Sequence, residues 1–415
     1  MAESLDEILR RAAQNKVPRR SFLAAAGLLG GSAALAACGG GNSATAAPTT
    51  APTAAASAAP TAGATTAPSA AASAAAVSSF PPAGPVEKQL YMYNWSDYIN
   101  PDNITAFKTK FGVEKFQYDT FANNEELLAK MQARATGYDI TAPTGEYVPA
   151  LKEGGFIQQL DKSRIPNWNF NKAFQDLVWD PTNTWYMPKD FGTTGILVRS
   201  KLVTEPLTSW TEFADLVKGK YSGKVTFVDS MGDVFVMPLK MIGKSLNSID
   251  KADLDQARTI LMDLAPHILA LDSDTQNVKL SGDNPECVLA LGWTGILAAM
   301  RKDPKSADIT YVVPTDGTLF WLDAWVLVKD APNPNAAYAF LNFIEQPDIQ
   351  GAETNYTGYG TPNDAAKPYV DPALLKDPAV FPPPDAMAGL EPAVDTSSNQ
   401  QRIDIWQEFK SKIGG

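Results

Sequence analysis

The sequence predicts an α/β protein with mostly parallel sheets covered by helices. Short apolar runs with strand character alternate along the chain with longer amphipathic runs of helical period. This alternation is typical of parallel strands joined by helical crossovers. Residues 87–415 also have a globular mix of apolar and charged side chains, and they are long enough for two domains of ordinary size.

Individual elements follow from the apolar spacing and from the residues that begin and end it. The segment 123–136 predicts a helix because Asn residues open it, acidic side chains lie in its first turn and Gly137 ends it. The predicted strands are 89–93, 113–118, 138–141, 224–228, 288–291, 309–313 and 324–328. The other predicted helices are 102–111, 210–217, 251–264 and 335–344.

Residues 1–38 predict an export signal that lies outside the fold. Arg19 and Arg20, in Pro-Arg-Arg-Ser-Phe-Leu, form a twin-arginine (Tat) export pattern. The apolar run 22–37 is shorter than the roughly 20 residues that span a bilayer. It ends on Leu-Ala-Ala-Cys-Gly, which resembles a bacterial lipoprotein signal and predicts a lipid anchor on Cys38 at the periplasmic or extracellular face of the cell membrane. The alternative is a transmembrane anchor that contains these residues by chance.

Residues 39–86 predict a disordered tether. They contain no charged residue and one aromatic, Phe80, and consist mainly of Ala, Thr, Ser, Pro and Gly. Such a composition cannot bury a core. As a flexible coil the segment would reach roughly 40 Å, enough to hold a globular body away from the membrane. A stalk that carries a surface enzyme would have the same composition, so the tether predicts a location and not a function.

The charge balance of the body excludes one class of partner. The whole chain carries a formal charge of −11. Residues 1–38 hold five basic and three acidic side chains, so the remainder stands at −13. An acidic body repels nucleic acid and favours cationic partners.

Cysteine and histidine usage argues against several enzyme classes. After lipidation of Cys38 only Cys287 remains, so no intramolecular disulfide is available. The single histidine, His267, has no sequence partner for acid–base catalysis. The sequence lacks the ligand spacing of a zinc site, a Gly-x-Ser-x-Gly elbow, a phosphate loop and a dinucleotide fingerprint. No catalytic residue, cofactor or metal is therefore predicted.

Aromatic and acidic or small polar residues gather at the ends of the predicted strands. Residues 94–98 follow the first strand, residues 230–233 and 292–295 follow later ones, and residues 320–323 enter the last. In parallel sheets, ligands bind in the loops beyond the strand carboxyl ends. Aromatic faces cover alkyl chains, and carboxylates and ring faces hold ammonium groups, so this pairing predicts a site for an alkyl diamine. Taken singly, each aromatic fits a core position equally well.

Several motifs in order carry a resemblance to a known family. They are Tyr93-Asn94-Trp95-Ser96-Asp97-Tyr98, the acidic residue Asp233 before Val-Phe, Trp293, Phe320-Trp321-Leu322-Asp323, and Tyr359 in Tyr-Gly-Thr-Pro-Asn. Together they resemble the spermidine/putrescine-binding proteins of bacterial polyamine ABC importers, and the resemblance covers nearly all of residues 89–415.

This resemblance implies a fold and a function. The fold is the type II periplasmic-binding-protein fold, in which two α/β lobes joined by a hinge of crossing strands close on the ligand. Lobe 1 would comprise residues 87–190 with 322–365, and lobe 2 residues 191–321 with 366–415. The implied protein is a monomer that captures a polyamine and delivers it to ABC permease subunits, without catalysis.

The resemblance also implies the ligand site. Asp323 and Asp233 would anchor the amines from opposite lobes, and Asp97 would serve the other end of the ligand. Tryptophan faces would sandwich the methylenes, with further aromatic rings closing the box and Thr144 or Glu146 at its mouth. The complete predicted set is Trp95, Ser96, Asp97, Tyr98, Thr144, Glu146, Asp233, Trp293, Trp321, Asp323 and Tyr359.

Departures from the family pattern leave the ligand open. Ser230 stands where spermidine-type members have a second aspartate, although Asp229 is adjacent. Glu146 stands where an aromatic is expected, unless the loop shifts by one residue and presents Tyr147. These positions support an amine but do not choose between putrescine and spermidine. The alternatives are the same fold with another small cationic or amino-acid-like solute, and a lipid-anchored hydrolase that uses carboxylates such as Glu146 and Asp233.

Overall fold

The computed structural model describes residues 84–133, 137–301, 303–382 and 389–413. The predicted signal with its Cys38 lipidation site, and the tether up to residue 83, lie outside the described residues. Gly84 donates its N–H to Asn335 Oδ1 (3.0 Å) and Val86 packs against core side chains, so the last residues assigned to the tether contact the body. No helix within these four ranges is long and apolar enough to cross a membrane.

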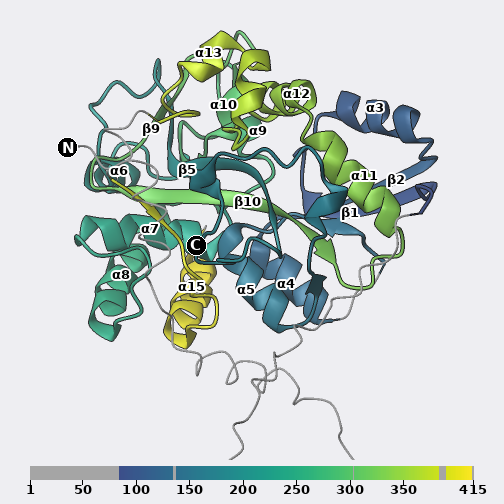
Figure 1. The fold of residues 1–415 in the computed structure, drawn as a ribbon. Coiled ribbons are helices and arrows are strands. Elements are labelled where there is room, and N and C mark those ends of the chain that lie inside the picture. Colours follow the sequence, from purple (N-terminus) through teal and green to yellow (C-terminus); the bar gives the residue numbers. More distant parts are fainter. Residues whose placement is uncertain (1–83, 134–136, 302, 383–388, 414–415) are drawn as a thin grey trace, which may run out of the picture. The chain divides into compact units, whose positions relative to one another are not determined.

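The described chain alternates strands and helices (Figure 1). The strands are β1 Gln89–Trp95, β2 Lys115–Phe121, β3 Ile140–Thr141, β4 Ile157–Gln158, β5 Met187–Arg199, β6 Val225–Phe227, β7 Ala270–Leu271, β8 Leu289–Trp293, β9 Ile309–Val312, β10 Thr318–Val328 and β11 Leu390–Pro392. The α-helices are α3 Pro101–Phe111, α4 Asn124–Gln132, α5 Val148–Glu153, α6 Trp210–Lys218, α7 Met231–Met241, α8 Lys251–Leu264, α9 Gln276–Leu280, α10 Gly295–Met300, α11 Pro334–Ile344, α12 Pro347–Thr357, α13 Pro372–Leu375 and α15 Gln400–Lys412. The short 3₁₀ helices are η1 Gly145–Tyr147, η2 Lys162–Arg164, η3 Lys172–Phe174, η4 Ala265–His267 and η5 Asp364–Tyr369.

The strands form one mixed sheet with two parallel ends. Its order is β2-β1-β3-β10-β5-β8-β6-β7, with β4 and β11 paired to β10 and β9 paired to β5. The end formed by β2, β1 and β3 is parallel, and so is the end formed by β8, β6 and β7. The long strands β5 and β10 pair antiparallel with each other and with the neighbouring strands β3 and β8, and they join the two ends, so the sheet is less parallel than predicted. Figure 1 shows β10 crossing from the side of α6 and α7 to the side of β1 and β2.

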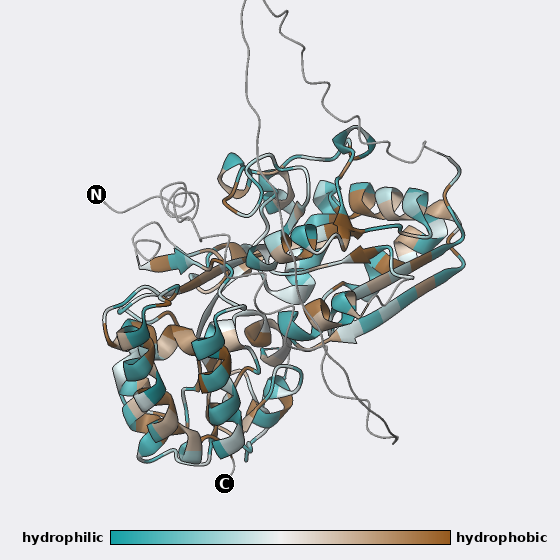
Figure 2. Ribbon diagram, turned by 90° about the horizontal axis from the view of Figure 1, so that it is seen from below, coloured by the Kyte–Doolittle hydropathy of each residue, from teal (hydrophilic) through white to brown (hydrophobic). Residues whose placement is uncertain are grey.

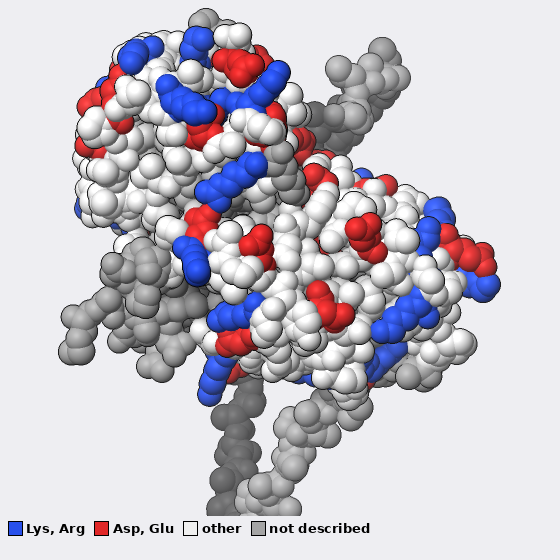
Figure 3. Space-filling view, turned by 90° about the horizontal axis from the view of Figure 1, so that it is seen from above, with Lys and Arg blue, Asp and Glu red and all other residues white. Residues whose placement is uncertain are grey.

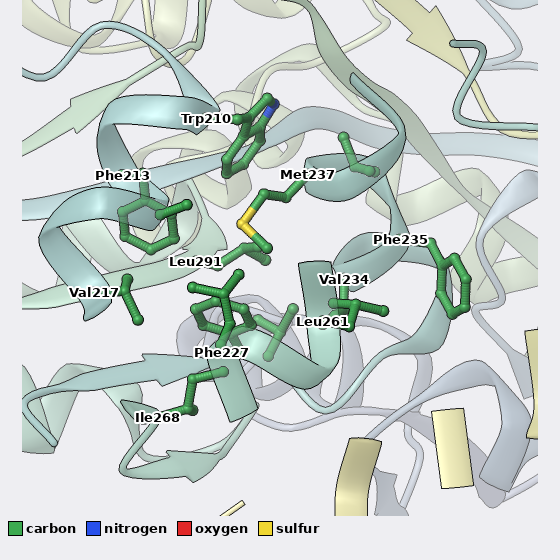
Figure 4. Close-up of a cluster of buried hydrophobic side chains, with 14 of the residues drawn as sticks. Trp210, Phe213, Val217, Phe227, Val234, Phe235, Met237, Leu261, Ile268 and Leu291 are labelled. Carbon is green, nitrogen blue, oxygen red and sulfur yellow. The ribbon is translucent and has the colours of Figure 1, made fainter. Parts of the chain in front are cut away.

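Core side chains gather in separate groups on the two sides of this centre. Aromatic and aliphatic residues of α6, α7, α8, β6 and β8 form one group, in which Trp210, Phe213, Phe227 and Leu291 point toward one another (Figure 4). Other groups pack around β1, β2 and α11. Strands β5 and β10 contribute side chains to both sides. Figure 2 shows hydrophilic and hydrophobic faces on the helices near the C-terminus, as expected for helices that cover a core.

Helix caps explain several of the element boundaries. Asn123 caps α4 by accepting from Glu126 N–H (2.8 Å), and Ser209 opens α6 in a capping box with Glu212. Helix α3 ends at Gly112, whose φ of 68° lies in the left-handed region that glycine tolerates. Of the predicted helix 123–136, residues 124–132 are helical, and residues 134–136 lie outside the description.

Two sequence predictions of local structure were wrong. Strand β10 starts at Thr318 and not at residue 324, so Phe320-Trp321-Leu322-Asp323 lies inside the strand. Every residue of β10 is buried, so the strand includes residues on the N-terminal side of the predicted apolar run. The prediction of a loop at residues 230–233 does not hold, because Ser230 is the N-cap of α7 and Asp233 lies in its first turn. The apolar run of α7 contains Pro238, which hid the helical pattern.

Candidate ligand-binding site

A single cavity of about 190 Å³ collects the predicted site residues. All eleven residues predicted to bind the ligand line it. The sequence left open whether Glu146 or Tyr147 faces the ligand. Both residues line the cavity, because both lie in the single turn of η1. The cavity also includes residues that no sequence motif indicated, among them Asp395 and Arg402.

Aromatic rings form the apolar walls of the cavity. Trp95, at the end of β1, donates its Nε1–H to Ala142 O (2.9 Å), and its ring lies edge-on to Trp293 with centroids 5.7 Å apart. Trp321 meets Tyr359 edge-on at 5.0 Å, and Tyr98 meets Tyr359 at 5.5 Å. Rings in such edge-to-face arrays fix one another's orientation and leave flat faces for an alkyl chain.

Asp323 belongs to a buried network on β10 and β5. Its side chain is 5 % exposed, and its Oδ2 accepts from the Tyr98 hydroxyl at 2.7 Å. The same hydroxyl also lies within hydrogen-bond distance of Asp190, whose Oδ2 is 2.5 Å from Lys189 Nζ. Since a tyrosine has one proton, it can donate to only one of the two carboxylates at a time.

This network changes the protonation of Asp323. Burial, followed by the nearby charge of Asp190, raises the pKa of Asp323 to about 7, against opposing contributions from Tyr98, Lys189 and Thr144. Burial also raises the pKa of the Tyr98 hydroxyl well above its ordinary value. A bound cation would therefore favour the ionised form of the Asp323 carboxyl.

Asp233 presents a second buried carboxylate, from the first turn of α7. It accepts hydrogen bonds from the Thr194 hydroxyl, from Ser230 Oγ (2.5 Å) and from Trp293 Nε1 (3.0 Å). Burial raises the pKa of Asp233, while these three donors lower it. Ser230 thus orients the Asp233 carboxylate. The helix N-terminus adds a favourable field for the carboxylate.

Asp97 and Ser96 lie in the turn after β1 and are exposed. Asp97 has a φ of 54°, a left-handed conformation that aspartate tolerates better than most residues. Its Oδ1 accepts from the Tyr356 hydroxyl. Thr144 is buried, and Asn124 holds it through two hydrogen bonds of 3.0 and 2.9 Å. The role of Asp97 at one end of a ligand stays a prediction.

The cavity lining is strongly acidic. It contains the carboxylates Asp97, Glu146, Asp233, Asp274, Asp323 and Asp395 and, as the only cationic side chain among its described residues, Arg402. Arg402 is occupied by protein oxygens, because its guanidinium donates to Leu246 O, Ser248 O and Thr396 Oγ1. On the face that Figure 3 shows, acidic and basic side chains are interspersed. Within the described ranges, no group of three His, Cys, Asp or Glu side chains could hold a metal ion.

Some residues of this site have no counterpart in the sequence predictions. Lys189 and Asp190 come from β5, and Glu125 lies under Tyr147 in α4. A Lys-Asp pair inside an otherwise apolar strand was the one available signal, because buried charges require partners. Asp395 carries no motif, and only the path of the chain after β11 brings it to the cavity.

Comparison with known proteins places the chain among binding proteins. Residues 102–382 match the model of the family described as bacterial extracellular solute-binding protein. The putrescine-binding periplasmic protein PotF of Escherichia coli (strain K12) is 32% identical over 348 residues, covering 78% of this chain and 92% of the relative. The spermidine/putrescine-binding periplasmic protein of the same organism is 30% identical over 328 residues, covering 78% and 91%.

A substrate-binding protein of known structure is also similar to this chain. The spermidine/putrescine ABC transporter substrate-binding protein PotD from Streptococcus pneumoniae superposes with a TM-score of 0.65 at 30% sequence identity. The superposition covers 79% of this chain and 99% of that chain.

Proposed function

The chain belongs to the family of bacterial extracellular solute-binding proteins, and we propose that it is the substrate-binding component of an ABC importer for a polyamine, putrescine or spermidine. It captures the ligand, delivers it to the permease subunits and catalyses no reaction. The observation that carries the proposal is the lining of the cavity, where aromatic walls enclose carboxylates that have no free cationic partner in the described chain.

The chemistry of a polyamine fits this lining. Its methylenes need apolar cover, which the rings of Trp293 and Trp321 supply. A desolvated ammonium over an aromatic face gains up to about 2 kcal/mol, and a hydrogen bond to a charged group contributes about 1.5 to 3 kcal/mol. Asp323 and Asp233 supply such charges, and each is already oriented by its own donors.

Ligand capture involves two lobes in this proposal. Lobe 1 comprises residues 87–190 with 322–365, lobe 2 comprises residues 191–321 with 366–415, and β5 and β10 act as the hinge. The division is supported by the antiparallel β5–β10 pair, which joins the two parallel ends of the sheet. A ligand held by Asp323 from lobe 1 and Asp233 from lobe 2 favours the closed arrangement through its differential affinity.

A panel of amines tests both parts of the proposal. Putrescine, cadaverine and spermidine are expected to raise the thermal unfolding temperature, because a ligand at a hundredfold excess over its Kd stabilises the folded state by about 2.7 kcal/mol. Solution scattering of the same samples is expected to report a smaller radius of gyration. Glutamate, which carries a net negative charge, serves as the control and should change neither quantity. A shift with anionic solutes only would contradict the proposed cargo, and binding without compaction would contradict the two-lobe clamp.

The cellular location forms a second part of the proposal. We propose Tat-dependent export, lipidation of Cys38 and a flexible tether, which together hold a monomeric body near its permease outside the cell membrane. The Cys38→Ala variant is expected to leave the membrane fraction and appear in the soluble exported fraction, because one diacylated residue supplies the anchor. Fractionation with a carbonate wash measures this. Retention of Cys38→Ala in washed membranes would contradict the anchor.

A further inference from the structure

We propose that the cavity contains a third ammonium subsite, formed by Glu146 with Glu125 and Asp395, which selects polyamines with three or more amines over diamines. This inference rests on the proposed function, because it names the class of polyamine that the same cavity prefers. The three carboxylates and Tyr147 are called the Glu146 subsite below.

The Glu146 subsite is assembled from three separate segments. Glu125 lies in the first turn of α4, Glu146 lies in η1, and Asp395 follows β11. Tyr147 is their common neighbour: its hydroxyl hydrogen-bonds Glu125, and the charges of all three carboxylates act on it. Glu146, Tyr147 and Asp395 line the cavity itself. The fold, and not a single loop, therefore brings these three segments together.

Two oxygens of the subsite have no hydrogen-bond partner. Glu125 Oε1 and Glu146 Oε2 are buried atoms without a donor among the described residues. Glu146 lines the cavity, and Glu125 is hydrogen-bonded to Tyr147, which lines it as well. A buried carboxylate oxygen without a donor costs roughly 1 to 3 kcal/mol, more when the group is charged. Such atoms indicate a donor that the described residues do not supply, and an ammonium group offers up to three.

The described part of the chain provides no cation for these carboxylates. None of the ion pairs within the described chain involves Glu125, Glu146 or Asp395. Asp395 receives only Ser397, through its backbone N–H (2.9 Å) and its hydroxyl (2.6 Å). Arg402 donates to carbonyls and a hydroxyl, as described above. Burial raises the pKa of the Glu125 and Glu146 carboxyls, and a bound cation would favour their ionised forms.

The subsite is additional to the two buried anchors, Asp323 and Asp233, and to the exposed Asp97. Asp323 and Asp233 have their own sets of oriented donors, and two anchors suffice for the two ammonium groups of a diamine. Glu146 lies close enough to Asp233, Asp323 and Asp395 for their charges to act on it. A third ammonium on the same ligand would reach it without leaving the cavity. A diamine would leave it unoccupied, so the affinity difference favours the triamine.

Titration calorimetry with putrescine and spermidine on the purified full-length protein tests this inference. The wild-type protein is expected to bind spermidine at least tenfold more tightly than putrescine. In Glu146→Gln, which keeps the shape and removes the charge, the ratio of spermidine to putrescine affinity is expected to fall at least fivefold. The matched control is Glu153→Gln, an exposed carboxylate outside the cavity that follows Glu146 by seven residues, and it should leave the ratio unchanged.

A second variant keeps the test decisive if Glu146→Gln unfolds. Asp395→Asn retains an acceptor for Ser397 and is expected to lower the same ratio. An unchanged ratio in a folded variant, or an equal loss for both ligands, would overturn the third subsite while leaving polyamine binding intact. A wild-type protein that binds neither putrescine nor spermidine would overturn the subsite together with the proposed function.

Discussion

Replacing Asp323 with asparagine is expected to weaken polyamine binding by more than about thirtyfold, or about 2 kcal/mol. Asparagine keeps the shape of the side chain but removes the charge that faces the ligand. Since Asp323 is only 5 % exposed, water cannot replace the lost charge, and a bound ammonium would stay unneutralised. Calorimetry with putrescine and spermidine measures the loss.

Two further variants show whether the loss comes from charge at this position. Asp330→Asn makes the same change just after β10, at an exposed residue whose φ of 58° asparagine also tolerates, and it should bind as the wild type does. Trp321→Leu should lose less than Asp323→Asn, because it removes ring contact and cation–π energy but keeps apolar cover. Unchanged affinity of Asp323→Asn for every polyamine tested would make this carboxylate structural.

A second large effect is expected from pH. The ligand-free protein should lose stability, on the order of a few kcal/mol, as the pH rises from about 5 to about 8. Burial raises the pKa of Asp323 and of Glu353 to about 7, above the ordinary values of 3.8 and 4.5. Between those values the folded protein binds protons that the unfolded chain has released, so the free energy of unfolding falls as the pH rises through the folded pKa. Denaturant unfolding at several pH values measures this.

Polyamine affinity is expected to change in the opposite direction. An ammonium binds the ionised form of Asp323, whose population rises from about a tenth near pH 6 to about nine tenths near pH 8, so binding should tighten about tenfold. The ligand amines stay protonated over this range. The Asp323→Asn variant should lose most of this dependence. An affinity that is flat, or weaker at the higher pH, would show that Asp323 does not titrate with binding.

Much of the fold was predictable because it depends on local patterns. The α/β class was inferred from the alternation of strands and helices, and the type II binding-protein fold was implied by the resemblance; both are confirmed by the family match and the solved relative. The antiparallel pairing of β5 with β10 was not predicted. Both strands are buried along their whole length, so their apolar pattern carries no information about direction.

The candidate site also contains residues that the sequence predicted and residues that it did not. Trp95 and Asp323 belong to sequence motifs, and the structure brings them into one cavity with the other nine predicted residues. Asp190 and Asp395 were missed because pairing between distant segments brings Asp190 beside Asp323 and Asp395 to the cavity. Asp190 lies opposite Asp323 in the β5–β10 register, and Asp395 follows the pairing of β11 with β10. The spacing of residues within one segment does not predict contacts between distant segments, so these two residues were found only in the folded chain.

The central claim is that this acidic, aromatic cavity captures a polyamine and releases it unchanged. Titration calorimetry of the wild-type protein with putrescine and spermidine, followed by mass spectrometry of the recovered ligand, tests it most directly. We expect saturable binding of one ligand per chain, with the ligand recovered intact. The absence of binding to either polyamine, or conversion of the ligand to a product, would contradict the account.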